Sequence, residues 1–451
     1  MRLVAFSHQR LTALDCRKQE IEVVIKAPAR REDDDRVGTI ERQPGLGTHA
    51  SDERGSLGRG DRREDLRRPV AHDMDTRKSP SLGQRVYHGG RHTQVHVGIS
   101  AEQALVPADQ TGEQMPIAQS QRQQAGQVVP VHLASRHGCR YQAVSGSQLV
   151  RVGLGGKLAA VGCTLAGVAE ARRLLRLSET RLVLGFGGYA SGPLVIAART
   201  LGLPAAIHEA NVWPGLANRL LGRIASRVYL NDDAASRHFP AGRWLVTGWP
   251  VRQEVSALAH EPRRPAVGDR PARVLICSGS RGGAFFGQRV PAVLERLSAN
   301  GMRIEARHQS AEADPGPISD AYRRAGVPAG VMAFIDDMRD AYLWADVAIT
   351  RAGAGTIAEL ALAGLPALLV PLADAAEDHQ APNAKACASA GAGFWVREGA
   401  WNAEDLAGRL SKLLTDPAAW EAASAGARQR AAPDAADRVV DDCEAIMRGR
   451  W

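Results

Sequence analysis

Residues 350–371 place the strongest constraint on the fold, because they run from a strand through a glycine turn and a helix into a second strand. An apolar run at 347–350 enters Gly353-Ala354-Gly355, and Gly364-Leu365-Pro366 separates the helix from the next apolar run. A helix that begins at such a turn presents backbone N–H groups to a phosphate. Glu359 follows one turn later, where a carboxylate can accept hydrogen bonds from both hydroxyls of a ribose. The stretch therefore predicts a site for a nucleoside diphosphate, held without a metal.

The same strand-turn-helix unit recurs from residue 151 onward, and this repetition predicts an α/β fold. Short apolar runs alternate with helical patterns, an order typical of parallel sheets covered by helices on both faces. A Pro- and Arg-rich hinge, Glu261–Arg270, separates two such series, so we predict domains at 151–260 and 261–451 that face a cleft. Ligands of such domains bind at the carboxyl ends of the strands. The predicted strands are Arg181–Gly185, Pro204–His208, Val228–Asn231, Trp244–Thr247, Arg273–Cys277, Val331–Ile335, Val347–Thr350 and Ala367–Pro371.

Residues 1–150 differ in composition from the rest of the chain. They hold 15 of the 20 glutamines and 8 of the 13 histidines, but none of the eight tryptophans. Their apolar residues keep no sustained period, and runs such as Arg30–Arg36 and Asp61–Arg68 are strongly charged. A segment with so little apolar surface does not offset the entropy lost on ordering. We interpret residues 1–150 as a poorly ordered or aberrant polar segment that carries no chemistry.

The chain has a net charge of +8, which suits a polyphosphate ligand, an anionic membrane surface or nucleic acid. No nucleic-acid motif accompanies the charge, so a nucleic-acid partner is disfavoured. Lys157–Leu177 is a basic helical pattern that suits a membrane surface, although such a helix more often packs on a sheet. No apolar run is long enough to span a bilayer, and no signal peptide is evident. The six cysteines are scattered without metal-ligand spacing, which predicts a reduced cytosolic protein. We expect neither a metal nor a cofactor.

Two further segments of the second domain follow predicted strands and suit a ligand. Ser278–Gly283 precedes a helix, and its small residues allow a phosphate to approach closely, although a tight turn without a ligand explains it equally well. Glu377–Gln380 and Asn383 lie where sugar hydroxyls are recognised, although a polar surface loop is the commoner fate. Thr356 and Glu359 also have the spacing of a capping box, which alone would explain both residues.

The first domain offers candidate acid–base groups beside a glycine-rich turn. His208 and Glu209 end a predicted strand, and the pKa of either side chain is tunable by burial. A hydrogen-bonded structural histidine is the alternative for His208, and Asn211 and Asn218 suit turns or caps equally well. Gly185–Pro193 suits an anionic acceptor, or simply a Gly-Pro turn.

Taken in order, these motifs resemble the MurG family of UDP-N-acetylglucosamine transferases. The resemblance covers about residues 151–445, and it implies two Rossmann-like domains of the GT-B type facing a cleft, the first of them incomplete. The matching segments are Gly185–Pro193, His208–Asn211, Gly248–Arg252, Gly279-Ser280, Phe334–Met338, Gly353–Glu359, Ala363–Pro366, Asp378–Gln380 and Asn383.

The resemblance also implies a reaction and a role for each matching residue. The reaction is an inverting, metal-independent transfer of GlcNAc from UDP-GlcNAc to the MurNAc C4 hydroxyl of undecaprenyl-linked lipid I, at the cytoplasmic face of the cell membrane. Ile335 meets the uracil through its backbone, Glu359 the ribose, and Ser280 and Thr356 the phosphates. The full donor set is Arg252, Ser280, Ile335, Thr356, Glu359, His379, Gln380 and Asn383. The acceptor side comprises Gly187, Gly188, Tyr189, Ser191, Asn211 and Asn218, with His208 and Glu209 as candidate catalytic residues.

The chain departs from this family near its beginning. The family opens with a strand and a Gly-Gly-Thr-Gly-Gly-His loop, which residues 1–150 lack, since Tyr87–His92 has neither the preceding strand nor the spacing. Two alternative functions follow. One is a transferase of the same type that acts on another lipid or a natural product, and the other is an inactive UDP-sugar-binding protein.

The missing loop leads us to interpret residues 1–150 as a replaced or misread segment, for example from an out-of-frame translation start. Sequencing the upstream region of the gene tests this hypothesis, and we expect another reading frame there to encode the glycine loop. A region that encodes no such loop in any frame would show the interpretation to be wrong.

Overall fold

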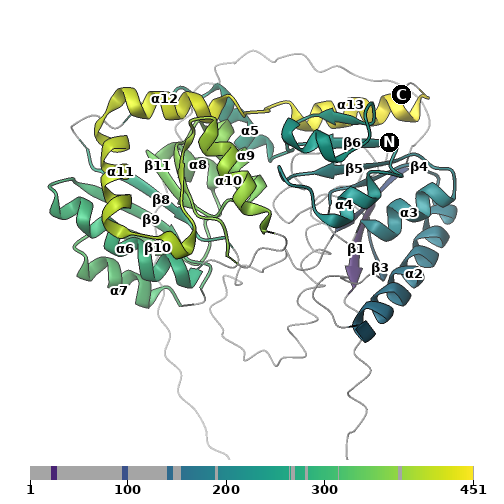
Figure 1. Ribbon diagram of the computed structural model, residues 1–451, viewed down its shortest axis with the longest axis horizontal. Helices are drawn as coiled ribbons and strands as arrows, with labels where there is room; N and C mark the ends of the chain where they lie inside the picture. Colours follow the sequence, from purple (N-terminus) through teal and green to yellow (C-terminus); the bar gives the residue numbers. More distant parts are fainter. Residues whose placement is uncertain are drawn as a thin grey trace, which may run out of the picture. The chain divides into compact units, whose positions relative to one another are not determined.

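A computed structural model describes residues 22–27, 94–99, 140–145, 154–187, 191–263, 265, 270–279, 283–312, 314–373 and 378–449 of the protein. Within these residues, two sheets of parallel strands alternate with helices, which confirms the predicted α/β class (Figure 1).

The first sheet has seven strands among the described residues, in the order β3-β1-β2-β4-β5-β6-β7, and all neighbours are parallel. These strands are β1 (Glu22–Ala27), β2 (Gln94–Ile99), β3 (Arg140–Ser145), β4 (Thr180–Gly185), β5 (Ala205–Glu209), β6 (Arg227–Leu230) and β7 (Trp244–Val246). The helical segments between them are α2 (Leu154–Leu177), α3 (Gly192–Thr200), α4 (Leu216–Leu221) and the 3-10 helix η3 (Asp233–His238).

Strands β4 to β7 lie where the sequence predicted strands, whereas β1 to β3 do not. They belong to residues 1–150, for which no strand was predicted and the opening strands of the sheet were expected to be missing. Each is only six residues long, so its apolar alternation does not stand out within a long polar segment. The first sheet therefore includes three strands that the polar composition of residues 1–150 does not indicate.

The second sheet has six strands in the order β10-β9-β8-β11-β12-β13, all parallel within the described part of the chain. They are β8 (Ala272–Cys277), β9 (Ile304–Gln309), β10 (Ala329–Met332), β11 (Val347–Thr350), β12 (Ala367–Leu369) and β13 (Gly393–Trp395). Its helices are α6 (Gly283–Ala299), α7 (Gly316–Arg324), α8 (Met338–Trp344), α9 (Ala354–Ala363), α10 (Gln380–Ser389), α11 (Ala403–Thr415) and α12 (Pro417–Arg428). Short helical segments at α5 (Gln253–Ser256), η4 (Ala257–His260) and η6 (Glu398–Ala400) complete the connections, and α13 (Ala435–Met447) follows α12.

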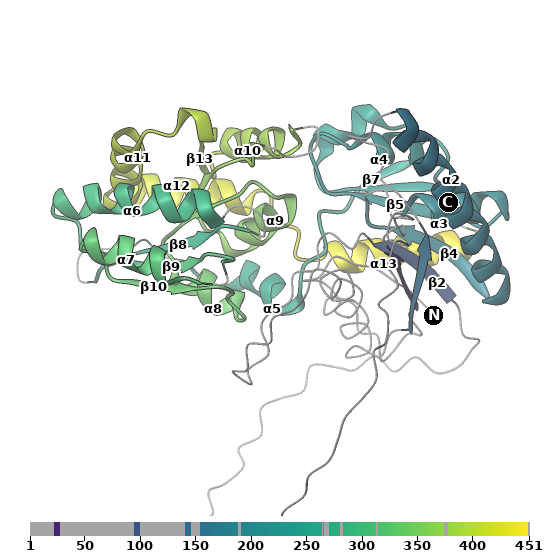
Figure 2. The ribbon, with the colours of Figure 1, turned by 90° about the horizontal axis from the view of Figure 1, so that it is seen from below.

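Strand β8 shows why this sheet is buried on both faces. Its side chains alternate, so Val274 and Ile276 pack with α6 and α11, while Leu275 and Cys277 pack with α8 and α9. Both sets are at most 7% exposed. Helices α6 and α11 lie side by side in both views (Figures 1 and 2). The continuous apolar run of β8 is thus the pattern of a strand covered on two sides.

Helix α13 returns from the second sheet to the first. Asp442 accepts hydrogen bonds from Arg227 Nε at 2.9 Å and from the Tyr229 hydroxyl at 2.9 Å, both on β6. Arg181 of β4 donates to the main-chain oxygen of Met447 at 2.7 Å. The yellow helix beside the first sheet in Figure 2 is this segment. The chain therefore links the two sheets twice, once after β7 and once after α12.

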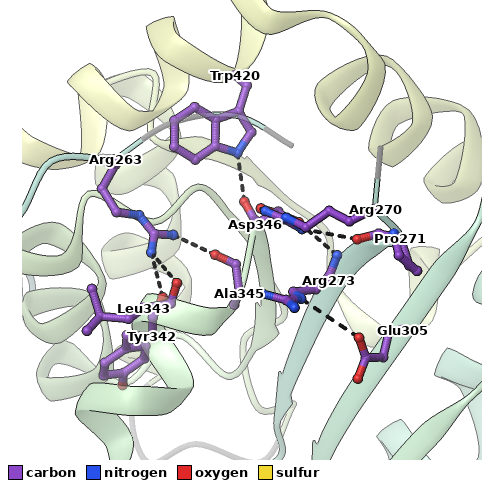
Figure 3. A network of polar contacts seen from close by, with 10 residues as sticks. All are labelled: Arg263, Arg270, Pro271, Arg273, Glu305, Tyr342, Leu343, Ala345, Asp346 and Trp420. Carbon is purple, nitrogen blue, oxygen red and sulfur yellow. Dashed lines mark hydrogen bonds and ion pairs between the residues drawn. The ribbon is translucent and has the colours of Figure 1, made fainter. Parts of the chain in front are cut away.

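Asp346 organises the amino-terminal end of the second sheet (Figure 3). Its carboxylate accepts two bonds from Arg270, at 2.7 and 2.6 Å, and one from the Arg273 N–H at 2.8 Å. Its main-chain oxygen accepts from the indole N–H of Trp420 at 2.7 Å. Asp346 is 2% exposed, and four hydrogen bonds compensate for its burial, donated from the segment before β8, from β8 itself and from α12.

We expect Asp346→Ala to lower the free energy of unfolding by about 2 kcal/mol, because it removes the side-chain acceptor of the Arg273 N–H and leaves Arg270, among the described residues, with only the main-chain oxygen of Pro271. Urea unfolding followed by circular dichroism measures the change. Asp320→Ala is the matched control, since its ion pair with Arg323 is exposed and worth less than about 1 kcal/mol. Equal losses in both variants would contradict the role given to Asp346.

Candidate functional site

Helix α9 begins at the glycine turn for which a phosphate site was predicted. Gly353 is its N-cap, with φ −67° and ψ 134°, and no side chain caps the helix. The first-turn N–H groups, up to Thr356, have no acceptor within the helix. Thr356 lies inside the helix rather than at its cap, so the capping-box alternative for Thr356 and Glu359 is wrong.

Glu359 occupies a buried position on α9, with 3% of the residue exposed. Its Oε2 accepts a hydrogen bond from the Tyr342 hydroxyl at 2.7 Å. Its Oε1 is buried, and no described residue donates to it. A carboxylate oxygen in this state favours a ligand donor such as a ribose hydroxyl.

Arg252 is the N-cap of α5 and brings a cation to the same group of residues. Its Nε and Nη2 are buried without a hydrogen-bond partner in the described part of the chain, and the carboxylate of Glu254 is 3.8 Å from Nε. Burial and the charge of Glu359 raise the pKa of Tyr342 well above its ordinary value, and Arg252 opposes that shift. Arg252 thus lies close enough to Tyr342 to act on it electrostatically, and its contact with a nucleotide stays a prediction.

The second glycine loop follows β8, and its predicted phosphate ligand Ser280 lies outside the described residues. Gly279 begins the loop with φ +63°, a left-handed conformation that favours glycine. The preceding Ser278 hydroxyl is 3.2 Å from Nε2 of His308, whose Nδ1 is 2.9 Å from the Tyr322 hydroxyl. Burial lowers the pKa of His308 to about 4, so the imidazole is neutral at neutral pH. This neutral network holds the end of β8 from which the loop departs.

Ile335 lies in the loop between β10 and α8, and its side chain is buried. The strand predicted at Val331–Ile335 is wrong at both ends, because β10 runs from Ala329 to Met332. The apolar run continues beyond the sheet because Ile335 packs into the core beside α8. Ile335 therefore lies beyond the end of β10, and its contact with a uracil stays a prediction.

The predicted sugar-reading residues lie at the start of α10. His379 is the N-cap, and Oε1 of Gln380 accepts a hydrogen bond from the Leu372 N–H at 2.9 Å. Asn383 is 3% exposed, so its amide is the most enclosed of the three.

Asn383 contacts the predicted acceptor side directly. Its Nδ2 donates to Oδ1 of Asn211 at 3.0 Å and to the main-chain oxygen of Ala352 at 3.3 Å. Its Oδ1 accepts from the Val212 N–H at 2.9 Å. The structure thus brings together a residue predicted for the donor and one predicted for the acceptor.

Glu209 ends β5 and is 2% exposed. Its Oε1 accepts from the Asn211 N–H at 2.8 Å and from Asn211 Nδ2 at 3.1 Å, and its Oε2 accepts from Asn218 Nδ2 at 2.8 Å. Burial raises the pKa of Glu209 above its ordinary value, and the hydrogen bonds from Asn211 and Asn218 oppose that shift. The carboxylate fixes the loop after β5, with both predicted asparagines as its donors.

His208 precedes Glu209 and is fully buried. Its Nε2 is 2.9 Å from the main-chain oxygen of Gly248, so this nitrogen is the donor. Its ring stacks on Phe186 at 5.5 Å between centroids and meets the edge of Trp249 at 4.7 Å. The histidine thereby joins β5 to the crossing segment after β7.

The glycine-rich turn after β4 is described only in part. Gly187 has φ +79°, and a Cβ there would lie 3.3 Å from Nδ2 of Asn218 and 3.4 Å from the main-chain oxygen of His208. Ser191 is the fully buried N-cap of α3. Gly188 and Tyr189 lie outside the described residues. The conformation of Gly187 therefore favours glycine, and the residue lies in close contact with the loop after β5.

Sequence reasoning missed Tyr342 and Val212. Tyr342 sits in an ordinary helical pattern on α8, and Val212 contributes only its N–H, so neither carries a motif signal. Only the tertiary contacts with Glu359 and Asn383 reveal them.

Comparison with known proteins agrees with this geometry. The profile of the glycosyltransferase family 28 C-terminal domain matches residues 273–439, and that of the N-terminal domain matches residues 130–230. A relative from Magnetococcus marinus is 37% identical over 310 residues, covering 68% of this chain and 84% of the relative. The chain belongs to glycosyltransferase family 28. It is therefore a glycosyltransferase, and the resemblance seen in its motifs is confirmed.

Other family members give the same result. The Magnetococcus protein is named UDP-N-acetylglucosamine–N-acetylmuramyl-(pentapeptide) pyrophosphoryl-undecaprenol N-acetylglucosamine transferase. A relative of the same name from Ectopseudomonas mendocina is 42% identical over 286 residues, covering 63% of this chain and 78% of the relative. The crystal structure of Acinetobacter baumannii MurG is 31% identical with a TM-score of 0.56, covering 69% of this chain and 92% of that one. Both the family and the GT-B arrangement of two domains rest on these matches.

Proposed function

We propose that the protein transfers GlcNAc from UDP-GlcNAc to the MurNAc C4 hydroxyl of undecaprenyl-linked lipid I, which gives lipid II for peptidoglycan synthesis. The observation that carries the proposal is the buried Oε1 of Glu359, which accepts from no described residue and lies on the helix whose N-terminus is uncapped. The hydroxyls of a ribose supply hydrogen-bond donors for Oε1. A diphosphate supplies negative charge at the positive N-terminus of α9. The name shared by the relatives supports the choice of sugar and acceptor.

In this proposal the acceptor hydroxyl attacks the anomeric carbon of the donor, and UDP leaves with inversion of configuration. The leaving diphosphate gains negative charge in the transition state. N–H groups at the N-terminus of α9 are already oriented toward it, so they stabilise that charge without reorganisation. His379, Gln380 and Asn383, at the start of α10, take the sugar, and Ile335 takes the uracil through its backbone.

Two residues remain candidates for removing the proton from the acceptor hydroxyl. Burial raises the pKa of Glu209 above its ordinary value, which makes its carboxylate a stronger base than an exposed one. The bonds that Glu209 accepts from Asn211 and Asn218 favour instead a role in positioning the acceptor loop. His208 has the same two alternatives, and the hydrogen bond between its Nε2 and the main-chain oxygen of Gly248 favours the structural one.

We expect Glu359→Ala to weaken UDP binding by about tenfold or more, because it removes a charged acceptor for two ribose hydroxyls. Isothermal titration with UDP measures the affinity. Glu421→Ala is the control, since Glu421 is exposed on α12, and it should bind UDP as the unchanged protein does. Unaltered affinity in Glu359→Ala would overturn the donor site.

A transfer assay with radiolabelled UDP-GlcNAc and lipid I separates the alternatives. Product formed on lipid I supports the proposed reaction. Transfer only to another acceptor favours a related transferase, and UDP binding without any transfer favours an inactive sugar-nucleotide-binding protein.

We further propose that the protein works as a peripheral protein at the cytoplasmic face of the cell membrane. Leu216, Leu220 and Ile224, on α4 and the turn that follows it, recur every four residues and are 46%, 51% and 40% exposed. Arg219 and Arg223 flank this apolar stripe and suit an anionic surface. Within the residues that the structure describes, no helix combines the length and the apolar character needed to cross a membrane.

Replacing Leu216, Leu220 and Ile224 together by serine should reduce binding to phosphatidylglycerol-containing vesicles at least about fivefold, because less apolar area enters the bilayer. Co-sedimentation measures the bound fraction. The pair Leu165→Ser and Leu177→Ser, exposed on α2, is the comparison and should bind nearly as before. A loss confined to the α2 pair would move the surface to that helix, and no loss in either would refute the proposal.

A further inference from the structure

The hydroxyl of Tyr342 is the hydrogen-bond partner of Glu359 among the described residues. The two atoms are 2.7 Å apart, and both residues are nearly fully buried, with 1% of Tyr342 and 3% of Glu359 exposed. The phenol can only donate to a carboxylate, so the bond fixes which oxygen of Glu359 is occupied. Oε2 is taken, and Oε1 is left for a ligand.

A glutamate side chain has three rotatable bonds, and without a fixed partner its carboxylate would sample several orientations. The bond to Tyr342 removes that freedom before any ligand arrives. Burial raises the pKa of the neighbouring Cys277 thiol to about 12. The thiol therefore stays protonated at neutral pH and places no second negative charge beside the carboxylate. Tyr342 itself stays protonated, since burial and the charge of Glu359 raise its pKa.

Tyr342 is also held from its main-chain side. Its carbonyl oxygen accepts a hydrogen bond from Nη1 of Arg263 at 2.8 Å, and the same guanidinium binds the carbonyls of Leu343 and Ala345 (Figure 3). Arg263 thereby satisfies the last carbonyls of α8 and fixes the end of that helix. Tyr342 is consequently held at both ends, by Glu359 at its hydroxyl and by Arg263 at its main-chain carbonyl.

We propose that Tyr342 is a positioning residue for the donor nucleotide: it orients Glu359 so that Oε1 is preset to accept the ribose hydroxyls. This inference rests on the proposed function, because it assumes that Glu359 binds a ribose. Tyr342 itself touches no ligand and acts only through the carboxylate. It therefore contributes to selection of a ribonucleotide over an analogue without ribose hydroxyls.

The test compares UDP with 2′,3′-dideoxy-UDP by isothermal titration, using the full chain and three variants. In Tyr342→Phe the ring still fills the core, but the donor is lost. We expect the preference for UDP over the dideoxy analogue to fall about tenfold, with the affinity for the analogue unchanged. Unchanged binding of the analogue also shows that the variant folds.

Tyr229→Phe is the matched control, because it removes another buried tyrosine hydroxyl, one that donates to Asp442 of α13. Its preference between the two nucleotides should stay at the original value. Glu359→Ala is the reference for complete loss of the preference.

The outcomes separate this inference from the proposed function. A preference lowered by Glu359→Ala but kept by Tyr342→Phe overturns the positioning role and leaves the donor site intact. Equal weakening of both nucleotides by Tyr342→Phe also overturns it, because a purely structural effect does not discriminate between them. A preference unchanged in Glu359→Ala refutes the ribose contact itself, and the role of Tyr342 with it.

Discussion

Glu359 carries its charge in a buried position where one oxygen accepts a hydrogen bond from Tyr342 and no described residue donates to the other. Burying a carboxylate costs several kcal/mol unless hydrogen bonds replace its hydration, so the unliganded site keeps part of that cost. A ligand with two hydroxyls at this position removes it. The arrangement depends on the order of elements in the parallel sheet. Helix α9, which carries Glu359, follows β11, and helix α8, which carries Tyr342, follows β10.

Local patterns predicted those elements that neighbouring residues determine. The strands β4 to β8, β11 and β12 follow from short apolar runs, and the turn at Gly353 and the bend at Gly364 follow from glycines that begin or end helices. Strand β9 was not predicted. The predicted end of a strand is wrong where an apolar residue beyond the strand enters the core, as Ile335 does after β10. The spacing of Thr356 and Glu359 matches a capping box, which requires Thr356 to be the N-cap. The helix starts earlier, with Gly353 as the N-cap, so that interpretation is wrong.

Contacts between distant segments were not accessible in the same way. Asn383 was predicted from a polar cluster, but its bonds to Asn211 and Val212 join residues about 170 positions apart, a separation over which no pattern operates. The strands β1 to β3 are a related case, since they are recognisable only as partners of one another and of β4. Likewise, Arg263 lies in a segment that was predicted as a hinge from its composition. Its guanidinium hydrogen bonds to the last carbonyls of α8, a contact that composition does not indicate.

The return of α13 to the first sheet has a consequence for how the polypeptide acquires its structure during synthesis. Arg227 and Tyr229 leave the ribosome before the entire second sheet, whereas Asp442, their partner, follows after it. Domains that consist of one continuous segment can fold as soon as they emerge. Here the earlier half waits with an incomplete surface until the later half has been made, so the two become native in overlapping rather than successive stages.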